Sequence, residues 1–147
     1  MSTFGHGDVF LTVRQLALSI ARIGGLRSEG KVLEALDLVR TTRDGIFGPM
    51  KHTLDQIDTQ AAARMLGSSD RINAAAELLQ QEGDIFEVRD ETGKALACRR
   101  RALEFYLEGV LLGSAPAEAT RAAIAALRRV ADEWRLPARY RTALAEL

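Results

Sequence analysis

Apolar residues recur every three or four positions along almost the whole chain, which is the spacing that gathers them on one side of an α-helix. No stretch alternates apolar and polar residues in the way that a half-buried strand requires. The pattern therefore predicts an all-α protein of six or seven helices. The expected helices cover approximately residues 8–23, 28–44, 49–66, 69–87, 92–112 and 114–134, with a short last helix after the break at Leu136-Pro137.

Glycine and proline mark where several of these helices are expected to begin and end. Gly24-Gly25 is expected to end the first helix, because glycine accepts the left-handed backbone conformation of a helix end. Pro49 is expected to open the third helix, where its missing N–H costs nothing, and Gly67 to end it. Gly83 falls on the inner stripe of the following helix, which predicts a close approach to a neighbouring helix.

Residues 92–112 form a segment that is apolar on most of its helical circumference, interrupted by one strip of charged residues. A helix of this composition packs against neighbours on several sides, so we expect it at the centre of the fold. The links between the predicted helices are short, which favours antiparallel neighbours. No linker or low-complexity segment divides the sequence, and we expect one helical domain over residues 1–147.

The composition narrows the class of protein. Twenty basic residues balance twenty acidic ones, whereas dedicated nucleic-acid binders usually carry a strong basic excess. The single cysteine excludes an internal disulfide and suits a reducing cytoplasm. No apolar run approaches the ~20 residues needed to span a bilayer, and residues 1–8 lack the pattern of a signal peptide. We therefore expect a cytoplasmic protein without a membrane segment.

Charge is distributed unevenly along the chain. Residues 1–93 hold 10 basic and 14 acidic side chains, whereas residues 94–147 hold 10 basic and 6 acidic ones. The basic last third leaves open a second function, a nucleic-acid-associated regulatory protein that uses its arginines to contact phosphates. These arginines are Arg121, Arg128, Arg129, Arg135, Arg139 and Arg141.

No constellation of residues indicates a catalytic, cofactor or metal site. The two histidines, His6 and His52, are far apart in sequence and outside any metal-ligand spacing. Cys98 precedes three arginines that would lower the pKa of a thiol, but it shares an apolar face with Ala102 and Phe105, which favours a buried and unreactive cysteine. We therefore expect no catalytic residue, no cofactor and no metal.

Residues 9–48 and 72–113 resemble the tetratricopeptide repeat, a helix–turn–helix unit of 34 residues. When the second segment is aligned with Ala76 as the first position of the repeat, its large, glycine, aromatic and alanine signature positions are filled. These positions are Leu79, Gly83, Phe86, Ala95 and Ala102. Arg99 and Leu107 depart from the repeat, because they stand where a large aromatic residue and a proline are usual.

The resemblance implies a scaffold of antiparallel helical hairpins that binds a protein or peptide partner and is not an enzyme. The chain is also similar to a group of bacterial tetratricopeptide-like proteins with the same helix order, which carries no known activity. In a tetratricopeptide unit, one face of the first helix lines the concave binding surface. The matching polar face here carries Glu77, Gln80, Asp84 and Glu87, and its three carboxylates predict a basic partner.

The terminal helices predict self-association as a homodimer. A short stack of helical hairpins leaves apolar ends uncovered unless something caps them, and contiguous exposed apolar patches mark contact sites. The residues that carry this prediction are Phe10, Leu11, Leu18, Trp134, Tyr140 and Leu144.

Overall fold

The computed structural model describes the backbone of residues 6–113 and 115–147, and the side chains of these ranges from residue 14 onward. All regular secondary structure in these ranges is helical, which confirms the predicted all-α class. No helix among the described residues is long and apolar enough to cross a membrane. The elements are α1 (His6–Ser28), α2 (Val32–Phe47), α3 (Met50–Leu54), α4 (Thr59–Leu66), α5 (Ser69–Val88), α6 (Thr92–Leu111), α7 (Glu118–Val130), the 3₁₀-helix η1 (Glu133–Arg135) and α8 (Ala138–Ala145).

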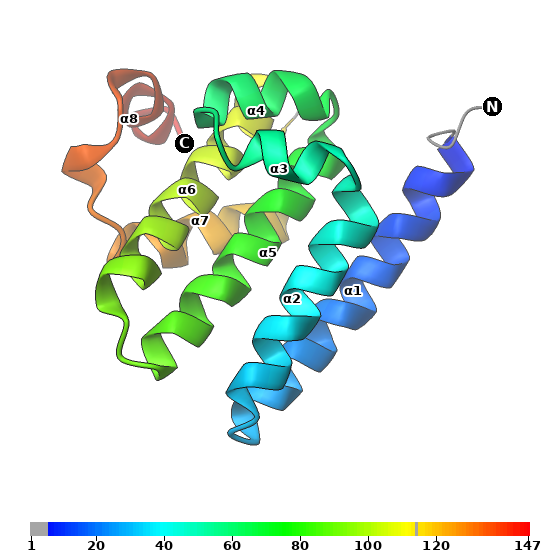
Figure 1. Cartoon of the computed structure of the whole chain (residues 1–147). Helices are drawn as coiled ribbons and strands as arrows, with labels where there is room; N and C mark the ends of the chain where they lie inside the picture. The colour runs from blue at the N-terminus through cyan, green and yellow to red at the C-terminus, as the bar shows by residue number, and fades with distance from the viewer. Residues whose placement is uncertain (1–5, 114) are drawn as a thin grey trace.

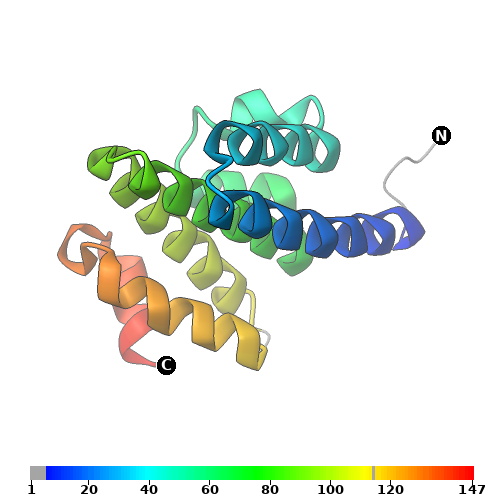
Figure 2. The ribbon, with the colours of Figure 1, turned by 90° about the horizontal axis from the view of Figure 1, so that it is seen from below.

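Two long helix pairs form the body of the molecule (Figure 1). α1 runs antiparallel to α2, α5 runs antiparallel to α6, and both α1 and α2 pack against α5. α4, α7 and α8 pack against α6. Figure 2 shows α7 on one side of the α5–α6 pair and α2 on the other. α1 packs against α5 and α7 packs against α6, so both helices border the central pair.

α6 is the central helix, as its sequence predicted. It contacts α4, α5, α7 and α8, and its second half is largely buried, with Ala102, Leu103 and residues 105–109 all buried. Leu103 and Leu107 are completely buried and belong to the main apolar cluster. Because α6 contacts four other helices, it holds α4, α5, α7 and α8 in position relative to one another.

The glycine pair Gly24-Gly25 does not end the first helix, contrary to our expectation, because α1 continues through it. Ile23 is completely buried and Leu26 packs against the core. Packing on both sides of the pair outweighs the ~1 kcal/mol that each helical glycine costs relative to alanine. The chain turns later at Gly30, whose φ of 80° is left-handed. There the Lys31 N–H donates to the carbonyl of Leu26 at 2.8 Å and closes the helix end.

Residues 49–66 form two short helices, α3 and α4, where the sequence predicted one. The described residues therefore contain eight α-helices rather than six or seven. At the break, the Asp58 carboxylate accepts a backbone N–H from the first turn of α4 at 2.8 Å. The Arg101 guanidinium donates to the carbonyl oxygens of Leu54 at 2.7 Å and Ile57 at 3.0 Å. Side chains thus bind backbone groups that a helix end leaves unpaired.

Gly83 lies at a close approach of two helices, as predicted. It is buried where α5 faces α6. A Cβ atom placed there would lie 3.1 Å from Cγ of Arg99 and 3.3 Å from the carbonyl oxygen of Ala95. The absence of a side chain at this position therefore sets how closely α5 and α6 pack.

Helical spacing through the expected helix 114–134 predicts that Val130 and Trp134 face inward together with Leu127. This is wrong for Val130 and Trp134, because they are 45% and 71% exposed. α7 ends at Val130 and the next residue is extended, so the helical register that placed Trp134 inward does not continue. The Arg135 guanidinium lies over the ring of Trp134 instead, 4.8 Å from its centroid. The buried apolar positions of α7 are Ile124 and Leu127.

The apolar surface expected to drive dimerisation is smaller than the sequence predicted. Tyr140 and Leu144 are buried, because α8 packs back against α6. Leu18, like Trp134, is exposed. Phe10 and Leu11 lie outside the residues whose side chains are described. Dimerisation itself stays a prediction.

Candidate functional site

The polar face of α5 that the sequence singled out borders a groove between α1 and α7. Glu77 and Gln80 line a hollow of about 240 Å³ in it. The other residues that line this hollow are Ile20 of α1, Gln81 of α5, Tyr106 of α6, and Ala119 and Thr120 of α7. The structure therefore brings two of the four predicted residues into a cavity that four helices share.

A second hollow, of about 180 Å³, continues the first toward the N-terminus of α5. The two hollows share Tyr106 and Thr120 in their walls. Asn73, Glu77 and Gln80 lie on one face of α5, because they are spaced four and three residues apart. The remaining lining residues are Ser69, Gly109, Val110, Ala115, Pro116 and Ala117. We refer to both hollows together as the α1–α7 groove.

Glu77 is the unpaired carboxylate of the α1–α7 groove. Burial raises its pKa above the ordinary value, and it forms no hydrogen bond or ion pair with any residue whose side chain is described. Beside it, the Tyr106 hydroxyl donates to Oε1 of Gln80 at 2.7 Å. Burial and the charge of Glu77 raise the pKa of Tyr106. The phenol therefore stays protonated and orients the Gln80 amide, while the Glu77 carboxylate remains open to a donor.

Asn73 adds an acceptor next to Glu77. Its Oδ1 atom is buried and has no hydrogen-bond partner among the described residues. It faces Gly109 of α6, where an added Cβ would lie 3.2 Å from that oxygen. Buried polar atoms are nearly always paired; of the buried side-chain atoms among the described residues, only Oδ1 of Asn73 and Oε2 of Glu91 lack a hydrogen-bond partner. The Glu91 carboxylate has ion pairs with Arg89 and Lys94. The Asn73 oxygen is therefore unusual, and it lies one turn of α5 from Glu77.

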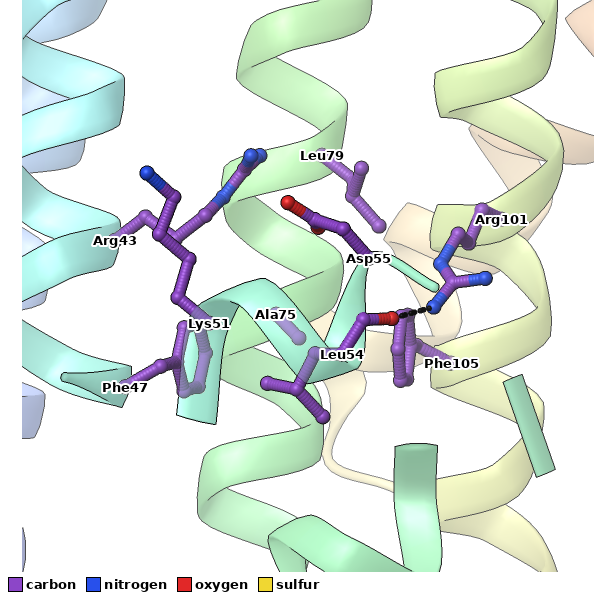
Figure 3. Close-up of a pocket in the computed structure, with 9 residues that line it drawn as sticks. All are labelled: Arg43, Phe47, Lys51, Leu54, Asp55, Ala75, Leu79, Arg101 and Phe105. Atoms are coloured by element: carbon purple, nitrogen blue, oxygen red, sulfur yellow. Dashed lines mark hydrogen bonds between the residues drawn. The ribbon is translucent and has the colours of Figure 1, made fainter. Parts of the chain in front are cut away.

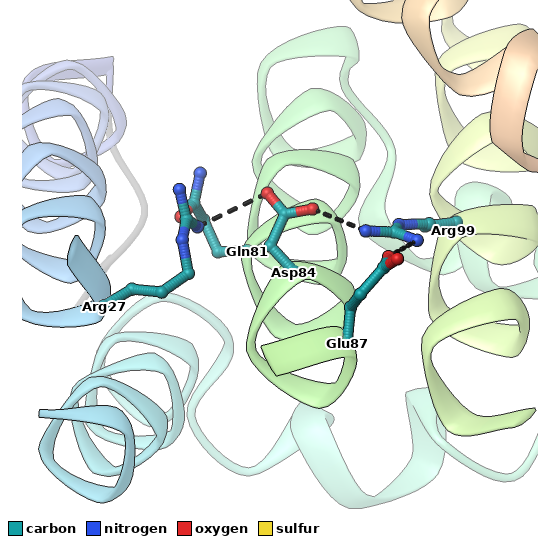
Figure 4. A network of polar contacts seen from close by, with 5 residues as sticks. All are labelled: Arg27, Gln81, Asp84, Glu87 and Arg99. Carbon is teal, nitrogen blue, oxygen red and sulfur yellow. Dashed lines mark hydrogen bonds and ion pairs between the residues drawn. The ribbon is translucent and has the colours of Figure 1, made fainter. Parts of the chain in front are cut away.

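Asp84 and Glu87 lie farther along α5 and are engaged by arginines (Figure 4). Arg27 of α1 donates to Oδ2 of Asp84 at 3.3 Å and to the Gln81 side chain at 2.9 Å. Arg99 of α6 donates to Oδ1 of Asp84 at 3.0 Å and forms an ion pair with Glu87. These two carboxylates therefore connect α1, α5 and α6. The four predicted residues share one helix face but divide into two environments, and partner binding to them stays a prediction.

A smaller pocket lies on the other side of α5, between α2, α3 and α6 (Figure 3). Its volume is about 40 Å³, which is room for a few water molecules at most. Of the charged residues at its edge, Asp55 is exposed and the others have partners. Arg43 pairs with Glu82 at 2.8 Å, and Lys51 pairs with Asp44 at 2.9 Å. Arg101 binds the carbonyl groups at the end of α3. We interpret this pocket as a gap in the packing, at whose edge Arg43, Lys51 and Arg101 all bind groups of the protein itself.

Cys98 is not an activated thiol. Its Sγ atom lies 3.7 Å from Oε1 of Glu82, to which it donates. Burial, together with the charge of Glu82, raises the pKa of the thiol to about 12, so the thiolate needed for nucleophilic attack is absent at neutral pH. His52 is exposed and its ring contacts the Gln56 amide, while the side chain of His6 lies outside the described ones. Among the described residues, no three His, Cys, Asp or Glu side chains cluster as metal ligands.

The arginines of the last third do not form one free basic surface. Arg139 donates twice to Glu108 at 3.0 Å, and the Tyr140 hydroxyl donates to the same carboxylate at 2.6 Å. These hydrogen bonds lower the pKa of Glu108 against the opposing effect of its burial. The other arginines divide into those with local acidic partners, Arg128 and Arg135, and those that are exposed without one among the described residues, Arg121, Arg129 and Arg141.

The sequence did not predict several residues that form the groove or hold its surroundings. Asn73 was detectable, because it precedes Glu77 by one helical turn. Ile20, Tyr106 and Thr120 were not, since only the packing of α1, α6 and α7 on α5 brings them there. Arg27 gave no signal either, because it lies 57 residues from Asp84.

Comparisons with known proteins identify no family for this chain. No protein-family model matches the chain, and neither curated proteins nor solved structures give a significant match.

Proposed function

We propose that this chain is a non-enzymatic, tetratricopeptide-like interaction domain that binds a basic segment of a partner protein in the α1–α7 groove. The observation that carries the proposal is the partly buried carboxylate of Glu77, which lines the groove without a partner among the described residues. A carboxylate withdrawn from water is costly unless a cation or hydrogen-bond donors compensate it. A lysine or arginine of the partner supplies that compensation.

The other partly or fully buried carboxylates on α5 and α6 each have a hydrogen-bond or ion-pair partner, and Glu77 has none among the residues whose side chains are described. Glu82 pairs with Arg43, Glu108 with Arg139 and Tyr140, and Glu104 accepts the Thr59 hydroxyl. Asp84 binds two arginines. The sequence thus provides internal donors for these carboxylates, and the one left without a donor is the one that faces a hollow.

The shape of the groove suits an extended segment. Asn73 and Gln80 are ~10 Å apart along the helix axis at 1.5 Å per residue, which matches about three residues of extended peptide. Along this length the wall offers the carboxylate of Glu77, the amide of Gln80 and the amide of Asn73. Ile20, Ala119 and Pro116 contribute apolar surface from the flanking elements. Apolar contacts therefore add to affinity while the carboxylate selects a basic side chain.

The test is a selection from random short peptides displayed on phage, followed by affinity measurement by fluorescence anisotropy. We expect enrichment of peptides with arginine or lysine. Glu77→Gln should weaken their binding by about tenfold, equivalent to ~1.4 kcal/mol. Glu87→Gln is the matched control, because Glu87 is on the same helix but already pairs with Arg99. Failure to enrich basic peptides, or equal affinity for the parent and Glu77→Gln, would refute the proposal.

A nucleic-acid-associated regulatory role is the second candidate, supported by the exposed Arg121, Arg129 and Arg141. We favour the peptide partner, because the net charge is zero and Arg128, Arg135 and Arg139 have acidic neighbours. Labelled duplex DNA and single-stranded RNA distinguish the two functions. A nucleic-acid binder would lose affinity steeply as salt rises and would be insensitive to Glu77→Gln.

A further inference from the structure

Another hollow surface lies between α1 and α2, and α5 contributes no residue to it. Its volume is about 380 Å³, and none of the described residues that line it is charged. The lining residues are Gln15, Leu16, Leu18 and Ser19 of α1, and Leu38, Thr41, Thr42, Gly45 and Ile46 of α2. We refer to this surface as the α1–α2 face.

The α1–α2 face is an apolar surface on the first helix pair of the described fold. Leu18 is 75% exposed, and Leu38 and Ile46 beside it are only partly buried. The end faces of stacked helix pairs are normally polar, because nothing further packs on them. An exposed leucine next to an uncharged hollow is the composition of a contact surface rather than of a solvated end.

Next to the hollow, α1 carries a basic residue and α2 carries an acidic one. Arg22 follows Leu18 by one turn of α1, and Glu34 precedes Leu38 by one turn of α2. Both are exposed, and neither pairs with the other or with another residue whose side chain is described. Because α1 and α2 are antiparallel, both charges lie toward the turn that joins the two helices (Figure 1). The α1 wall is therefore basic, and the α2 wall acidic, at the same end of the hollow.

We propose that two copies of this chain associate through their α1–α2 faces, about a two-fold axis parallel to the helices. Such an axis lays α1 of one copy over α2 of the other, antiparallel to it and at the same level. Leu18 of each copy then enters the hollow of the other, and Arg22 faces Glu34 of the other copy. A two-fold interface repeats every contact, so one basic and one acidic wall are self-complementary. Ile20 lies on a different side of α1, and the α1–α7 groove stays open in the dimer.

The experiment is sedimentation equilibrium of the full chain, whose monomer mass is 16.1 kDa. Concentrations up to about 100 µM are used, at which a dimer with a Kd of about 100 µM is half formed. We expect the parent to sediment as a dimer and Leu18→Glu as a monomer. Leu33→Glu is the matched control, because Leu33 is also exposed but does not line the hollow; this variant should remain dimeric.

Charge reversal tests the orientation of the two copies. Arg22→Glu alone and Glu34→Arg alone place like charges opposite each other and should each weaken dimerisation by roughly tenfold. The combined variant restores opposite charges and should recover the affinity of the parent. A monomeric parent, a dimeric Leu18→Glu, or a folded double variant without recovery would each overturn the proposal; circular dichroism establishes that every variant is folded.

Discussion

The two ends of the polar face of α5 differ in how their carboxylates are compensated. At the C-terminal end, Asp84 and Glu87 are bound by arginines from α1 and α6 (Figure 4). Near the middle, Glu77 has no such donor among the described residues and lines the α1–α7 groove. The residue type and the helical spacing are the same at both ends. The difference arises from what neighbouring helices present, so an acidic face on one helix becomes a structural link at one end and a candidate binding site at the other.

The largest effect is expected where one helix supports both regions. α6 supplies Arg99 to the arginine network and Tyr106 to the groove, and Leu103 lies between them, completely buried. Leu103→Ala empties a packed core site and should lower the free energy of unfolding by ~2–5 kcal/mol. Urea denaturation measures the change. Unaltered stability would mean that α6 is not the centre on which both regions depend.

Gly83→Leu should be the next most harmful change. A side chain at this position meets the backbone carbonyl of Ala95, which cannot move aside, and displaces Arg99 from Asp84. Overpacking of this kind costs ~1–3 kcal/mol. Gly93→Leu is the control, because Gly93 is exposed in the first turn of α6 with open space around it. The control should keep or raise the melting temperature, whereas an equally stable Gly83→Leu would contradict the close approach of α5 and α6.

The arginine network should contribute a smaller amount. Asp84→Asn removes the charge that Arg27 and Arg99 share, but Asp84 is 41% exposed, and solvent screens much of the interaction. We therefore expect a loss of about 1 kcal/mol in the free energy of unfolding. A double-mutant cycle with Arg99→Met isolates the coupling between the two residues. Strictly additive losses would show that the network is not an energetic link.

Helical periodicity predicted the features that depend on local spacing. The all-α class, the central position of residues 92–112 and the close approach at Gly83 follow from where apolar and small residues recur. Features that depend on tertiary packing were misjudged. Gly24-Gly25 continues a helix because Ile23 is anchored in the core, and Trp134 turns outward because α7 ends at Val130.

In the candidate site, too, local spacing predicted one part and tertiary packing decided the rest. Spacing alone placed Glu77, Gln80, Asp84 and Glu87 on one face of α5. The spacing could not show which of the four residues have partners within the protein, because the arginine that reaches Asp84 from α1 is 57 residues away in sequence. Which carboxylate stays without a donor is decided by the packing of α1, α6 and α7. The division of the face into network and groove was therefore beyond what the spacing contains.

The smallest predicted effect is a gain in the free energy of unfolding, whereas the substitutions above lower it. Burial raises the pKa of Glu77 in the folded protein, so the folded state favours the protonated carboxyl. Above the ordinary pKa, the unfolded chain is ionised without that penalty, and the ionised Glu77 therefore destabilises the free protein at neutral pH. Glu77→Gln keeps the shape and removes the charge. It should raise the free energy of unfolding at pH 7 by roughly a few tenths of a kcal/mol.

The pH dependence of this gain identifies its cause. As the pH falls through the raised pKa of Glu77 and then below its ordinary value of 4.5, the carboxyl becomes protonated in both states and the advantage of the Glu77→Gln variant over the parent disappears. Thermal melts of the parent and of Glu77→Gln from neutral to acidic pH measure this convergence. Asp84→Asn provides the contrast at neutral pH, since it removes a compensated charge and lowers stability. A Glu77→Gln variant less stable than the parent at pH 7 would mean that Glu77 has an internal donor, and that the two ends of the α5 face are compensated alike.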